Sequence, residues 1–575
     1  MTDFYALKKR SKIVDDGLSK YKLAILGDCA TQHIAIALRG TANIHGFTLD
    51  VLDADYDQIL EQIMEDQSDL YRFAPQAVLL IMCVEKLAES FKILPEESRA
   101  AFADNTIKTI RQYWETLSAK TTASILQFNF AYNNDGVMGS FALREPTSFA
   151  YQLQKLNYIL SEAAAQFKNV FLIDVNGVQS ECGRDTFCDD KLYYMAKMPI
   201  SLESLPAVAQ RTVDVLEALR GRAKKCVVLD LDNTLWGGVV GDDGLEGIQV
   251  GELGTGHAFT DFQHWLKELK KRGILLAVCS KNNEDIAKEP FEKHPEMVLR
   301  MDDISVFVAN WEDKASNILR IQQTLNIGMD SIVFLDDNPF ERDQVRSMIS
   351  ELSVPDLPED PALYVRTLRN MNLFETASYS NVDSQRTDQY RQEAERTMIL
   401  SNYGSYEDYL KALDMRAVAA PFDKFHYPRI AQLTQRSNQF NLRTVRYTEG
   451  QIQEIANDEA HITRYYSLKD KFGDYGLISV VILDKQPDND LFISEWLMSC
   501  RVLKRGMEEF VINDIINIAK KNGSNRVIGE YIKTPKNAMV ADLYERMGFI
   551  RNETKFYADI ATFGNLTTTI QEEAK

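Results

Sequence analysis

The sequence has no long apolar run, no excess of basic residues and no secretion signal. A membrane-spanning helix needs about 18 or more consecutive apolar residues, and no such stretch occurs. The 84 acidic and 65 basic side chains give a net charge of −19, which argues against a nucleic-acid partner because phosphate binding needs a basic surface. The start, MTDFYALKKRSK, lacks the apolar core of a secretion signal. These absences predict a cytoplasmic protein without membrane or nucleic-acid contacts.

The seven cysteines also lack the regular framework of a disulfide-bonded protein. Their odd number and scattered positions are typical of reduced thiols. Cys182 and Cys188 lie close together, but no second Cys/His pair follows to complete a zinc site. The sequence therefore indicates two unrelated cysteines at these positions.

A chain of 575 residues is too long for one core, and roughly 150 residues per domain suggests three or four domains. Three α/β segments follow one another without an internal repeat. Residues 1–220 alternate apolar strands with helical stretches such as 104–118, which predicts a parallel sheet. The strands expected there are 23–26, 77–82, 123–128 and 170–173.

Residues 221–370 show the same order of strands and helices, and residues 415–575 form a third α/β segment. A charged helical connector is expected between them, at 371–414. In the second segment we expect strands 226–230, 274–278 and 331–335 and helices 259–272 and 314–325. In the third we expect strands 478–483 and 491–497 and helices 508–521 and 538–547.

The second segment carries a pair of carboxylates directly after its first strand, in Asp230-Leu-Asp232-Asn-Thr234. In extended backbone, residues two apart project to the same side, so both carboxylates can face one ligand. One can attack phosphorus while the other protonates the leaving oxygen. Carboxylates and a phosphate repel one another unless a divalent cation lies among them, and oxygen ligands select Mg²⁺.

Three further motifs with polar residues end later strands or open a helix. Ser280 ends the next strand, and its hydroxyl and backbone N–H suit a phosphoryl oxygen. Lys314 begins a helix, where a fixed cation can offset charge on pentacoordinate phosphorus. Asp336 and Asp337 close a further strand and supply acidic metal ligands. Ligands of open α/β sheets bind at the carboxyl ends of strands, so this order of motifs predicts a phosphotransfer site.

The stretches LDLDNTLWGGVVGDDGLEGIQVG, LLAVCSKNNEDIA, HPEMVLR and VFLDDNPFERDQVR resemble the FkbH-like branch (subfamily IIIC) of the haloacid dehalogenase (HAD) superfamily. The resemblance covers residues 224–370 in detail and implies a HAD Rossmann-like core. It implies that Asp230 is the nucleophile and Asp232 the general acid/base. By the same resemblance Thr234, Ser280 and Lys281 bind the phosphoryl group, Lys314 balances charge, and Asp230, Asp232, Asp336 and Asp337 form the metal site. Which of Asp336 and Asp337 contacts the metal directly stays open.

The spacing of these motifs leaves no room for a separate cap domain, which typically needs more than about a hundred residues. Fifty positions separate Asp230 from Ser280, and 34 separate Ser280 from Lys314. An uncapped site leaves space for a large substrate, such as a carrier protein that presents a phosphopantetheine arm.

FkbH-like proteins are associated with dephosphorylation of 1,3-bisphosphoglycerate and transfer of its glyceryl unit to an acyl carrier protein. The resemblance implies this reaction here, with Cys279 as a candidate acyl acceptor beside Ser280. Alternatively Cys279 faces the core, since successive residues of a strand point to opposite faces. The competing functions are a plain phosphatase of a small phosphorylated metabolite and a non-enzymatic docking hub. The intact motif set argues against the hub.

The N-terminal block Ile25-Leu-Gly-Asp-Cys29-Ala resembles the GDS block of SGNH/GDSL hydrolases, which have a flavodoxin-type sheet. Cys29 replaces their serine, and no histidine occurs near 189–192, where their Asp-x-x-His pair would fall. Hydrolysis without a histidine base is difficult, so we expect a non-catalytic docking domain.

The segment Met498-Ser-Cys-Arg501-Val-Leu-Lys504-Arg505-Gly506 is similar to the pyrophosphate-binding R-x-x-G-x-G turn of GNAT acyltransferases, with Lys504 in place of the first glycine. This similarity implies a mixed sheet that binds coenzyme A or a phosphopantetheine arm. The implied cofactor-binding residues are Arg501, Arg505, Gly506, Asn537 and Tyr544. Tyr544 is also a candidate proton donor. A fold that binds a pantetheine arm without catalysis is the alternative.

An acidic carrier protein would need a local basic surface for docking. Lys267, Lys270, Lys271 and Arg272 are one candidate. The alternative is that they form the solvated face of an amphipathic helix.

Overall fold

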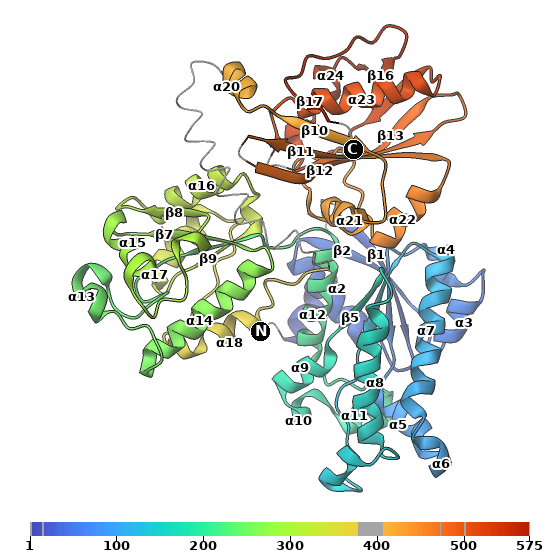
Figure 1. The fold of residues 1–575 in the computed structure, drawn as a ribbon. Helices are drawn as coiled ribbons and strands as arrows, with labels where there is room; N and C mark the ends of the chain where they lie inside the picture. Colours follow the sequence, from blue (N-terminus) through green and yellow to red (C-terminus); the bar gives the residue numbers. More distant parts are fainter. Residues whose placement is uncertain (1–2, 14–16, 378–405, 472, 500–501, 574–575) are drawn as a thin grey trace. The chain divides into compact units, whose positions relative to one another are not determined.

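The computed structural model describes residues 3–13, 17–377, 406–471, 473–499 and 502–573. By internal contacts the chain divides into two compact units, Met1–Glu217 and Ala218–Lys575. Its strands form three separate sheets (Figure 1), which confirms the predicted class of three α/β sheets. Within the described ranges no helix is long and apolar enough to cross a membrane.

The first unit contains a five-stranded parallel sheet in the order β2-β1-β3-β4-β5. Its strands are β1 Ser19–Gly27, β2 Phe47–Asp53, β3 Ala77–Ile81, β4 Ser124–Phe128 and β5 Val170–Ile173. The four predicted strands are confirmed as β1, β3, β4 and β5. The edge strand β2 was not predicted, because its half-exposed residues give it a weaker apolar signal than the central strands.

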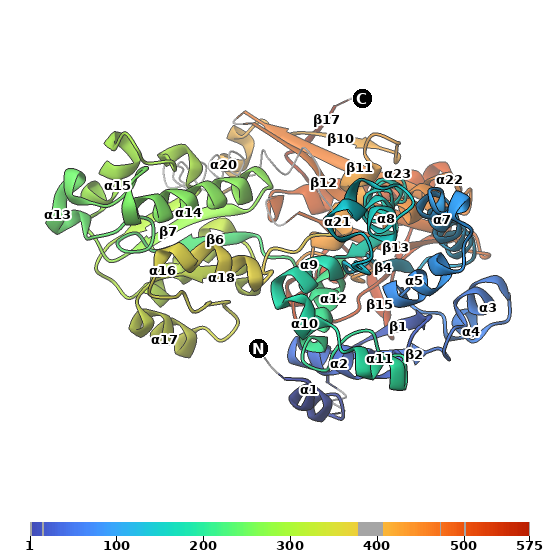
Figure 2. The ribbon, with the colours of Figure 1, turned by 90° about the horizontal axis from the view of Figure 1, so that it is seen from below.

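Helices cover both faces of this sheet. Helices α7 and α8 pack over one face around the fully buried Trp114, whereas α2 and α12 lie on the other side (Figures 1 and 2). The helices of this unit are α1 Phe4–Arg10, α2 Gln32–Ile44, α3 Ile59–Met64, α4 Asp69–Phe73, α5 Val84–Lys92, α6 Glu96–Arg99, α7 Phe102–Lys120, α8 Phe149–Ala164, α9 Val175–Cys182, α10 Arg184–Phe187, α11 Asp190–Ala196 and α12 Leu205–Leu219. Because both faces are covered, the central strands are apolar on both sides and appear in the sequence as continuous apolar runs.

The second unit contains a four-stranded parallel sheet in the order β8-β7-β6-β9. Helices α14 and α15 pack on one face of it and α16 and α17 on the other (Figure 2). The strands are β6 Cys226–Leu229, β7 Leu275–Ser280, β8 Val306–Ala309 and β9 Ile332–Leu335, and the helices are α13 Val240–Gly247, α14 Gly254–Lys271, α15 Glu284–Lys293, α16 Lys314–Leu325, α17 Pro339–Met348 and α18 Tyr364–Asn370. Between β6 and α14 only the short α13 is inserted, so this stretch contains no cap domain.

The second unit also contains an eight-stranded mixed sheet in the order β15-β16-β14-β13-β12-β11-β10-β17. Strands β13 and β14 are parallel and pair at only two positions, Leu491 with Val527 and Phe492 with Ile528. The strands are β10 Arg416–Ala420, β11 His461–Asp470, β12 Gly473–Lys485, β13 Leu491–Met498, β14 Arg526–Glu530, β15 Ile550–Asn552, β16 Lys555–Asp559 and β17 Gln571–Glu572, and the helices are α20 Tyr406–Ala412, α21 Tyr427–Arg436, α22 Glu449–Asn457, α23 Met507–Lys521 and α24 Leu543–Arg546.

The structure differs from one predicted helix of this segment, and it describes only part of the predicted connector before it. The predicted helix 538–547 is wrong as a single element, because the structure has a 3₁₀ helix Ala538–Val540 followed by α24. This break lets Val540, Leu543 and Tyr544 all enter the same core cluster. Of the predicted connector 371–414, residues 378–405 lie outside the described residues. The predicted boundaries at 220, 370 and 414 stay predictions.

Helix α1 packs against α2 at Gly40, which has no room for a side chain. A Cβ atom at Gly40 would lie 2.3 Å from the backbone oxygen of Leu7. We expect Gly40→Val to displace α1 and to lower the free energy of unfolding by about 1–3 kcal/mol, the usual cost of overpacking. Hydrogen exchange of residues 4–10 together with urea unfolding would measure both effects.

The matched control is Ile44→Val in the same helix, where the side chain is 48% exposed. We expect this variant to leave the exchange of α1 unchanged. Equal exchange in the two variants would show that the contact at Gly40 does not hold α1 in place.

Candidate active site

Three carboxylates meet at one edge of the four-stranded sheet. Asp230 follows the central strand β6, and its backbone N–H donates to the carbonyl of Leu335 at the end of β9 (3.0 Å). Asp336 and Asp337 follow β9 directly. Carboxylate oxygens of Asp230, Asp336 and Asp337 lie within 4.8 Å of one another. The pairing of β6 with β9 therefore brings together groups that are more than a hundred positions apart in the sequence.

Lys314 is the cation of this cluster. Its Nζ lies 3.0 Å from Oδ2 of Asp230 and 2.5 Å from Oδ2 of Asp336. Asp313 fixes the start of α16 by accepting a hydrogen bond from the backbone N–H of Ser316 (2.8 Å). Burial disfavours the charge on Lys314, but the two carboxylates outweigh this and raise the pKa of Lys314 above its usual value. Lys314 is therefore a permanent positive charge.

One lysine does not neutralise three neighbouring carboxylates. Burial, followed by the charge of Asp230, raises the pKa of Asp336 to about 6. The same two causes raise the pKa of Asp337. Excess negative charge on oxygen ligands in a buried site is the environment that Mg²⁺ fits. Asp230, Asp336 and Asp337 are the residues that would hold such an ion.

Thr234 and Arg342 orient the two aspartates after β9. The hydroxyl of Thr234 lies 3.1 Å from Oδ1 of Asp337, and the backbone N–H of Asp337 donates to the same hydroxyl oxygen (3.1 Å). The buried Arg342 donates to the carbonyls of Asp336 (2.7 Å) and Asp337 (2.6 Å). Arg342 was not predicted, because it lies within helix α17 and the site residues were sought at the ends of strands and at the start of a helix. The predicted phosphoryl-binding residue Thr234 thus also positions a carboxylate.

Asp232 lies next to this group but its carboxylate does not belong to the cluster of three. Oδ1 accepts hydrogen bonds from the indole N–H of Trp236 and the backbone N–H of Val240 (both 2.9 Å). Oδ2 accepts one from the amide of Asn282 (3.0 Å). Burial raises the pKa of Asp232, with a smaller contribution from Asp230. This arrangement favours the predicted role as proton donor and acceptor, and it does not support the carboxylate of Asp232 as a metal ligand.

The residues at the end of β7 divide between the two faces of the sheet. Ser280 is buried at the end of the strand, and Lys281 pairs with Glu341 through an Nζ–Oε1 distance of 2.6 Å. Cys279 is 0% exposed. It packs in the core cluster of α16 and α17, where its Sγ lies 3.7 Å from the carbonyl oxygen of Lys314.

The position of Cys279 does not support its predicted role as acyl acceptor. Burial raises the pKa of its thiol well above the usual range, which opposes formation of the nucleophilic thiolate. The structure instead follows the alternative expected from the alternation of a strand, in which Cys279 faces the core.

The comparisons with known proteins support the family. Residues 22–217 match the family model described as FkbH, N-terminal domain. A solved structure, the N-terminal part of the protein BF1531 from Bacteroides fragilis containing a phosphatase domain complexed with Mg, is 46% identical. The match covers 66% of this chain and 100% of that one, with a TM-score of 0.63. The chain belongs to the FkbH family. The search of curated proteins found no match.

The C-terminal segment of this FkbH family member matches acetyltransferase structures only weakly. The ribosomal-protein-S18-alanine N-acetyltransferase from Escherichia coli is 14% identical over 26% of this chain and 99% of its own, with a TM-score of 0.21. Spermidine N-acetyltransferase from Vibrio cholerae, in complex with CoA and spermine, is 12% identical over 26% and 98%, with a TM-score of 0.21. Neither match bears on the chemistry of this segment.

The residues predicted to bind a cofactor in that segment are mostly turned into the protein. Arg501 lies outside the described residues. Gly506 has φ +83° and is the N-cap of α23, so the predicted turn does lie at the start of a helix. The guanidinium of Arg505 is buried and donates to the hydroxyl of Tyr475, with Asp470 at 3.7 Å. Arg505 therefore contributes to the folded core of the segment instead of facing a ligand.

Asn537 and Tyr544 are also internal. The amide of Asn537 donates to the carbonyls of Asn441 (2.9 Å) and Ile532 (3.0 Å), and its oxygen accepts from the backbone N–H of Thr534 (2.8 Å). The ring of Tyr544 is stacked on Phe556 with centroids 5.2 Å apart and is fully buried. These contacts give both residues a packing role and do not support cofactor contact or proton donation.

Sequence reasoning missed a buried acid in the same sheet, Glu495 of β13. Its side chain is completely buried. Burial raises its pKa to about 8 despite the opposing charges of Arg446 and Arg443. A single glutamate within an apolar strand gives no motif, so no sequence signal could have identified it.

The geometry predicts opposite effects of Lys314 on catalysis and on metal binding. Lys314→Met removes the buried charge that offsets the carboxylates. We expect turnover to fall roughly 10²- to 10³-fold, as for the loss of a preorganised charge-stabilising group. We expect Mg²⁺ to bind more tightly, by roughly ten-fold or about 1.4 kcal/mol, because less positive charge opposes it. Calorimetric titration would measure the affinity.

The matched control is Lys267→Met, since Lys267 pairs with Asp303 elsewhere on this domain. It should change neither quantity. Unchanged Mg²⁺ affinity in Lys314→Met would contradict the idea that Lys314 and the metal share the same carboxylates.

Asp232 and Asp336 should separate proton transfer from metal binding. Asp232→Asn keeps the shape of the side chain, and we expect it to bind Mg²⁺ almost as wild type while turnover falls about 10²- to 10⁴-fold. Asp336→Asn should lose Mg²⁺ affinity as well as turnover. If Asp232→Asn lost Mg²⁺ to the same extent as Asp336→Asn, the carboxylate of Asp232 would be a ligand.

Proposed function

We propose that this FkbH family protein is a Mg²⁺-dependent phosphatase of the HAD type that loads a glyceryl unit onto an acyl carrier protein. The observation that carries the phosphatase part is the convergence of Asp230, Lys314 and the pair Asp336–Asp337 at one sheet edge. The 46% identical relative is described as containing a phosphatase domain complexed with Mg, which supports the same chemistry here.

The residues divide the reaction into two displacements. The carboxylate of Asp230 attacks phosphorus, the bond between phosphorus and the leaving oxygen breaks, and Asp232 gives its proton to that oxygen. In the second step Asp232 takes a proton from water as the water oxygen attacks the aspartyl phosphate, which releases phosphate and restores Asp230. Lys314 offsets the charge that develops on the phosphoryl oxygens. Bound Mg²⁺ supplies further positive charge at Asp230, Asp336 and Asp337.

The proposed substrate and partner are those associated with the FkbH family. The substrate is 1,3-bisphosphoglycerate, and the partner is a carrier protein with a phosphopantetheine thiol. The thiol attacks the carbonyl of the acyl phosphate, the bond from that carbon to the phosphate oxygen breaks, and this phosphate leaves as the thioester forms. Asp230 removes the other phosphate, the ester at carbon 3, because its attack on the acyl phosphate would leave a free carboxylate that cannot form a thioester. The absence of a cap between β6 and α14 supports a large partner. Cys279 is left out of this scheme because it is buried in the core.

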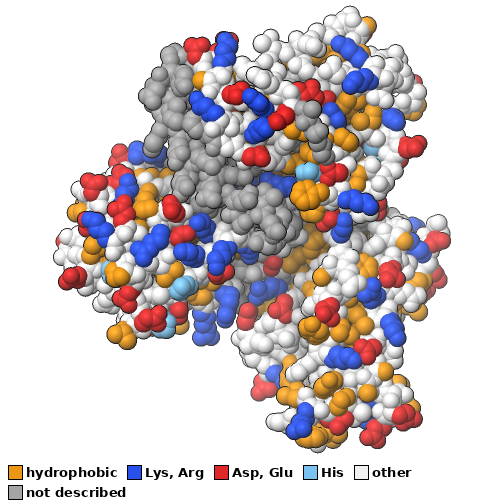
Figure 3. Space-filling model, viewed as in Figure 1, with side chains coloured by type: hydrophobic (Ala, Val, Ile, Leu, Met, Phe, Trp, Pro, Cys, Tyr) orange, Lys and Arg blue, Asp and Glu red, His pale blue; other side chains and the backbone are white. Residues whose placement is uncertain are grey.

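The predicted basic docking surface on α14 receives no support. Lys267 and Lys270 both pair with Asp303 (3.3 and 2.8 Å), and Lys271 pairs with Glu268 (2.6 Å). Figure 3 shows acidic and basic side chains interspersed over the visible face. These lysines fit the alternative of a solvated helix face, so we do not assign the docking of the carrier to them.

A plain phosphatase of a small phosphorylated metabolite is the second candidate. It uses the same catalytic residues, and it is favoured by the fact that no residue of the site is assigned to acyl transfer, since Cys279 is buried in the core. In this case the N-terminal and C-terminal segments act as scaffolds. We retain as proposals a docking role for residues 1–220 and the binding of coenzyme A or a pantetheine arm by residues 415–575.

The deciding experiment combines the full chain with Mg²⁺, freshly generated 1,3-bisphosphoglycerate and a carrier protein bearing its phosphopantetheine arm. Phosphate release and the intact mass of both proteins are followed together. Wild type and Cys279→Ser should both release phosphate and add a glyceryl-sized mass to the carrier. Asp230→Asn should not release the ester phosphate of the substrate, which is the phosphate that Asp230 attacks.

The other outcomes are equally informative. Phosphate release with an unmodified carrier would favour the plain phosphatase. Loading that disappears only in Cys279→Ser would make Cys279 the acceptor despite its burial. Absence of phosphate release in wild type would overturn the proposal as a whole.

A further inference from the structure

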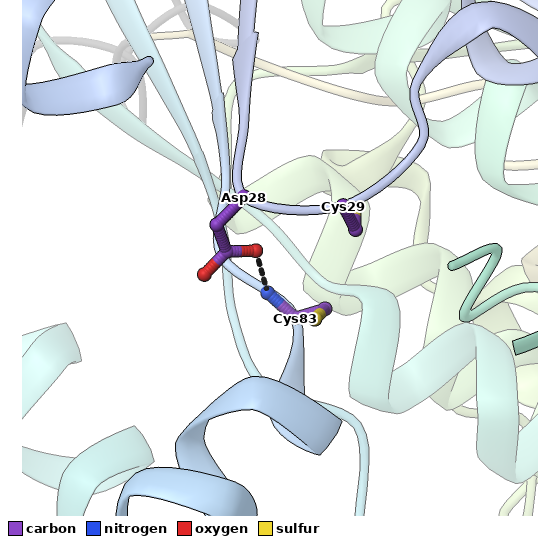
Figure 4. Close-up of side chains that lie close together, drawn as sticks. All are labelled: Asp28, Cys29 and Cys83. Carbon is purple, nitrogen blue, oxygen red and sulfur yellow. Dashed lines mark hydrogen bonds between the residues drawn. The ribbon is translucent and has the colours of Figure 1, made fainter. Parts of the chain in front are cut away.

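The first unit contains a second cluster of metal-ligand side chains, formed by Asp28, Cys29 and Cys83 (Figure 4). A carboxylate oxygen and the two Sγ atoms lie within 4.8 Å of one another. The three residues are 7%, 1% and 5% exposed, respectively. They have no part in the phosphatase mechanism.

The cluster lies at the topological switch point of the five-stranded sheet. Asp28 and Cys29 follow β1, and Cys83 lies two positions after the end of the neighbouring strand β3. Strand β2 pairs with the opposite side of β1, so the direction in which strands are added reverses between β1 and β3. The crevice at the carboxyl ends of two such strands is where open α/β sheets bind their ligands.

The backbone holds the three side chains in place. The N–H of Asp28 donates to the carbonyl of Ile81 (3.1 Å), and the N–H of Cys83 donates to Oδ1 of Asp28 (2.8 Å). The turn after β1, which carries Asp28 and Cys29, is tight, because a Cβ atom at Gly27 would lie 2.4 Å from Cγ2 of Thr31. The ligand atoms are therefore preorganised before anything binds.

Two thiols and one carboxylate form a donor set that Mg²⁺ disfavours and Zn²⁺ prefers. We propose that Asp28, Cys29 and Cys83 form a zinc site with an open fourth position. Binding releases the two thiol protons to solvent. Zinc with two thiolates and one carboxylate carries one net negative charge. The ammonium of Lys86, which is ion-paired with Asp57, acts on Asp28 with the opposite sign. Three protein ligands leave the fourth tetrahedral position for water or an external thiol.

The neighbouring groups favour metal binding over nucleophilic catalysis by Cys29. The ring of His33, four positions later, is engaged with Phe4 at a centroid distance of 5.4 Å. Asp189, at the position where the Asp-x-x-His pair of SGNH hydrolases would begin, accepts from the backbone N–H of Leu192 (3.1 Å) and caps α11. Neither group is arranged as a base for a thiol, whereas a metal ion activates thiolates without one.

The test uses the full chain, reduced and freed of metal, in excess Mg²⁺ so that the Asp230 site is occupied. Co²⁺ is titrated first, because thiolate coordination gives a charge-transfer absorption that oxygen ligands do not. Zinc per chain is then measured after dialysis for wild type, Cys29→Ser and Cys83→Ser. The matched control is Cys182→Ser, a half-buried thiol of the same unit.

Wild type and Cys182→Ser should show the thiolate absorption and bind one zinc more than Cys29→Ser or Cys83→Ser. Wild type without thiolate absorption would overturn the proposal, and this result does not depend on the folding of any variant. Equal zinc content in wild type and both cluster variants would also overturn it. A wild-type mass two hydrogens lower before reduction, without bound zinc after it, would show a disulfide instead. Phosphate release is measured in parallel, so failure of this proposal is distinguishable from failure of the proposed function.

Discussion

The salt bridges from Lys314 to Asp230 and Asp336 are the interaction on which the site depends. Without a cation, three carboxylates in a buried position would repel one another or stay protonated. The start of α16 places Lys314 between Asp230 and Asp336, and Asp313 fixes that start. Lys314 neutralises only part of the negative charge of the three carboxylates, and the remaining charge is available to bind a divalent metal.

The order of the strands in the four-stranded sheet brings Lys314 and the three carboxylates together. Strand β6 lies between β7 and β9, so the residues after β6 and β9 face each other and those of β7 lie alongside. Arg342 and Thr234 then orient Asp336 and Asp337. The same principle recurs in the first unit, where residues after β1 and β3 bring two thiols and a carboxylate together. In both sheets the candidate ligand side chains lie where neighbouring parallel strands end.

The structure brings together the site residues whose motifs end a strand or open a helix, and their catalytic roles stay predictions. Asp230, Lys314, Asp336 and Asp337 were identified because their motifs follow apolar strands in a fixed order. Arg505, Asn537 and Tyr544 were assigned to a cofactor by similarity to a family pattern alone, and their side chains are buried in the core, so the structure gives this prediction no support. A pattern of residue types does not specify the direction of a side chain when neighbouring segments compete for it.

The sequence by itself determined the three α/β sheets, the order of the phosphotransfer motifs and the absence of a cap within them. Apolar runs and the spacing of carboxylates are local properties of the chain, so they can be recognised from the sequence alone. The tertiary structure alone decided that Cys279 faces the core, that the carboxylate of Asp232 is held apart from the other three, and that Cys29 meets Cys83. These outcomes depend on which strands are neighbours and on which face each side chain packs, and both are set by long-range packing.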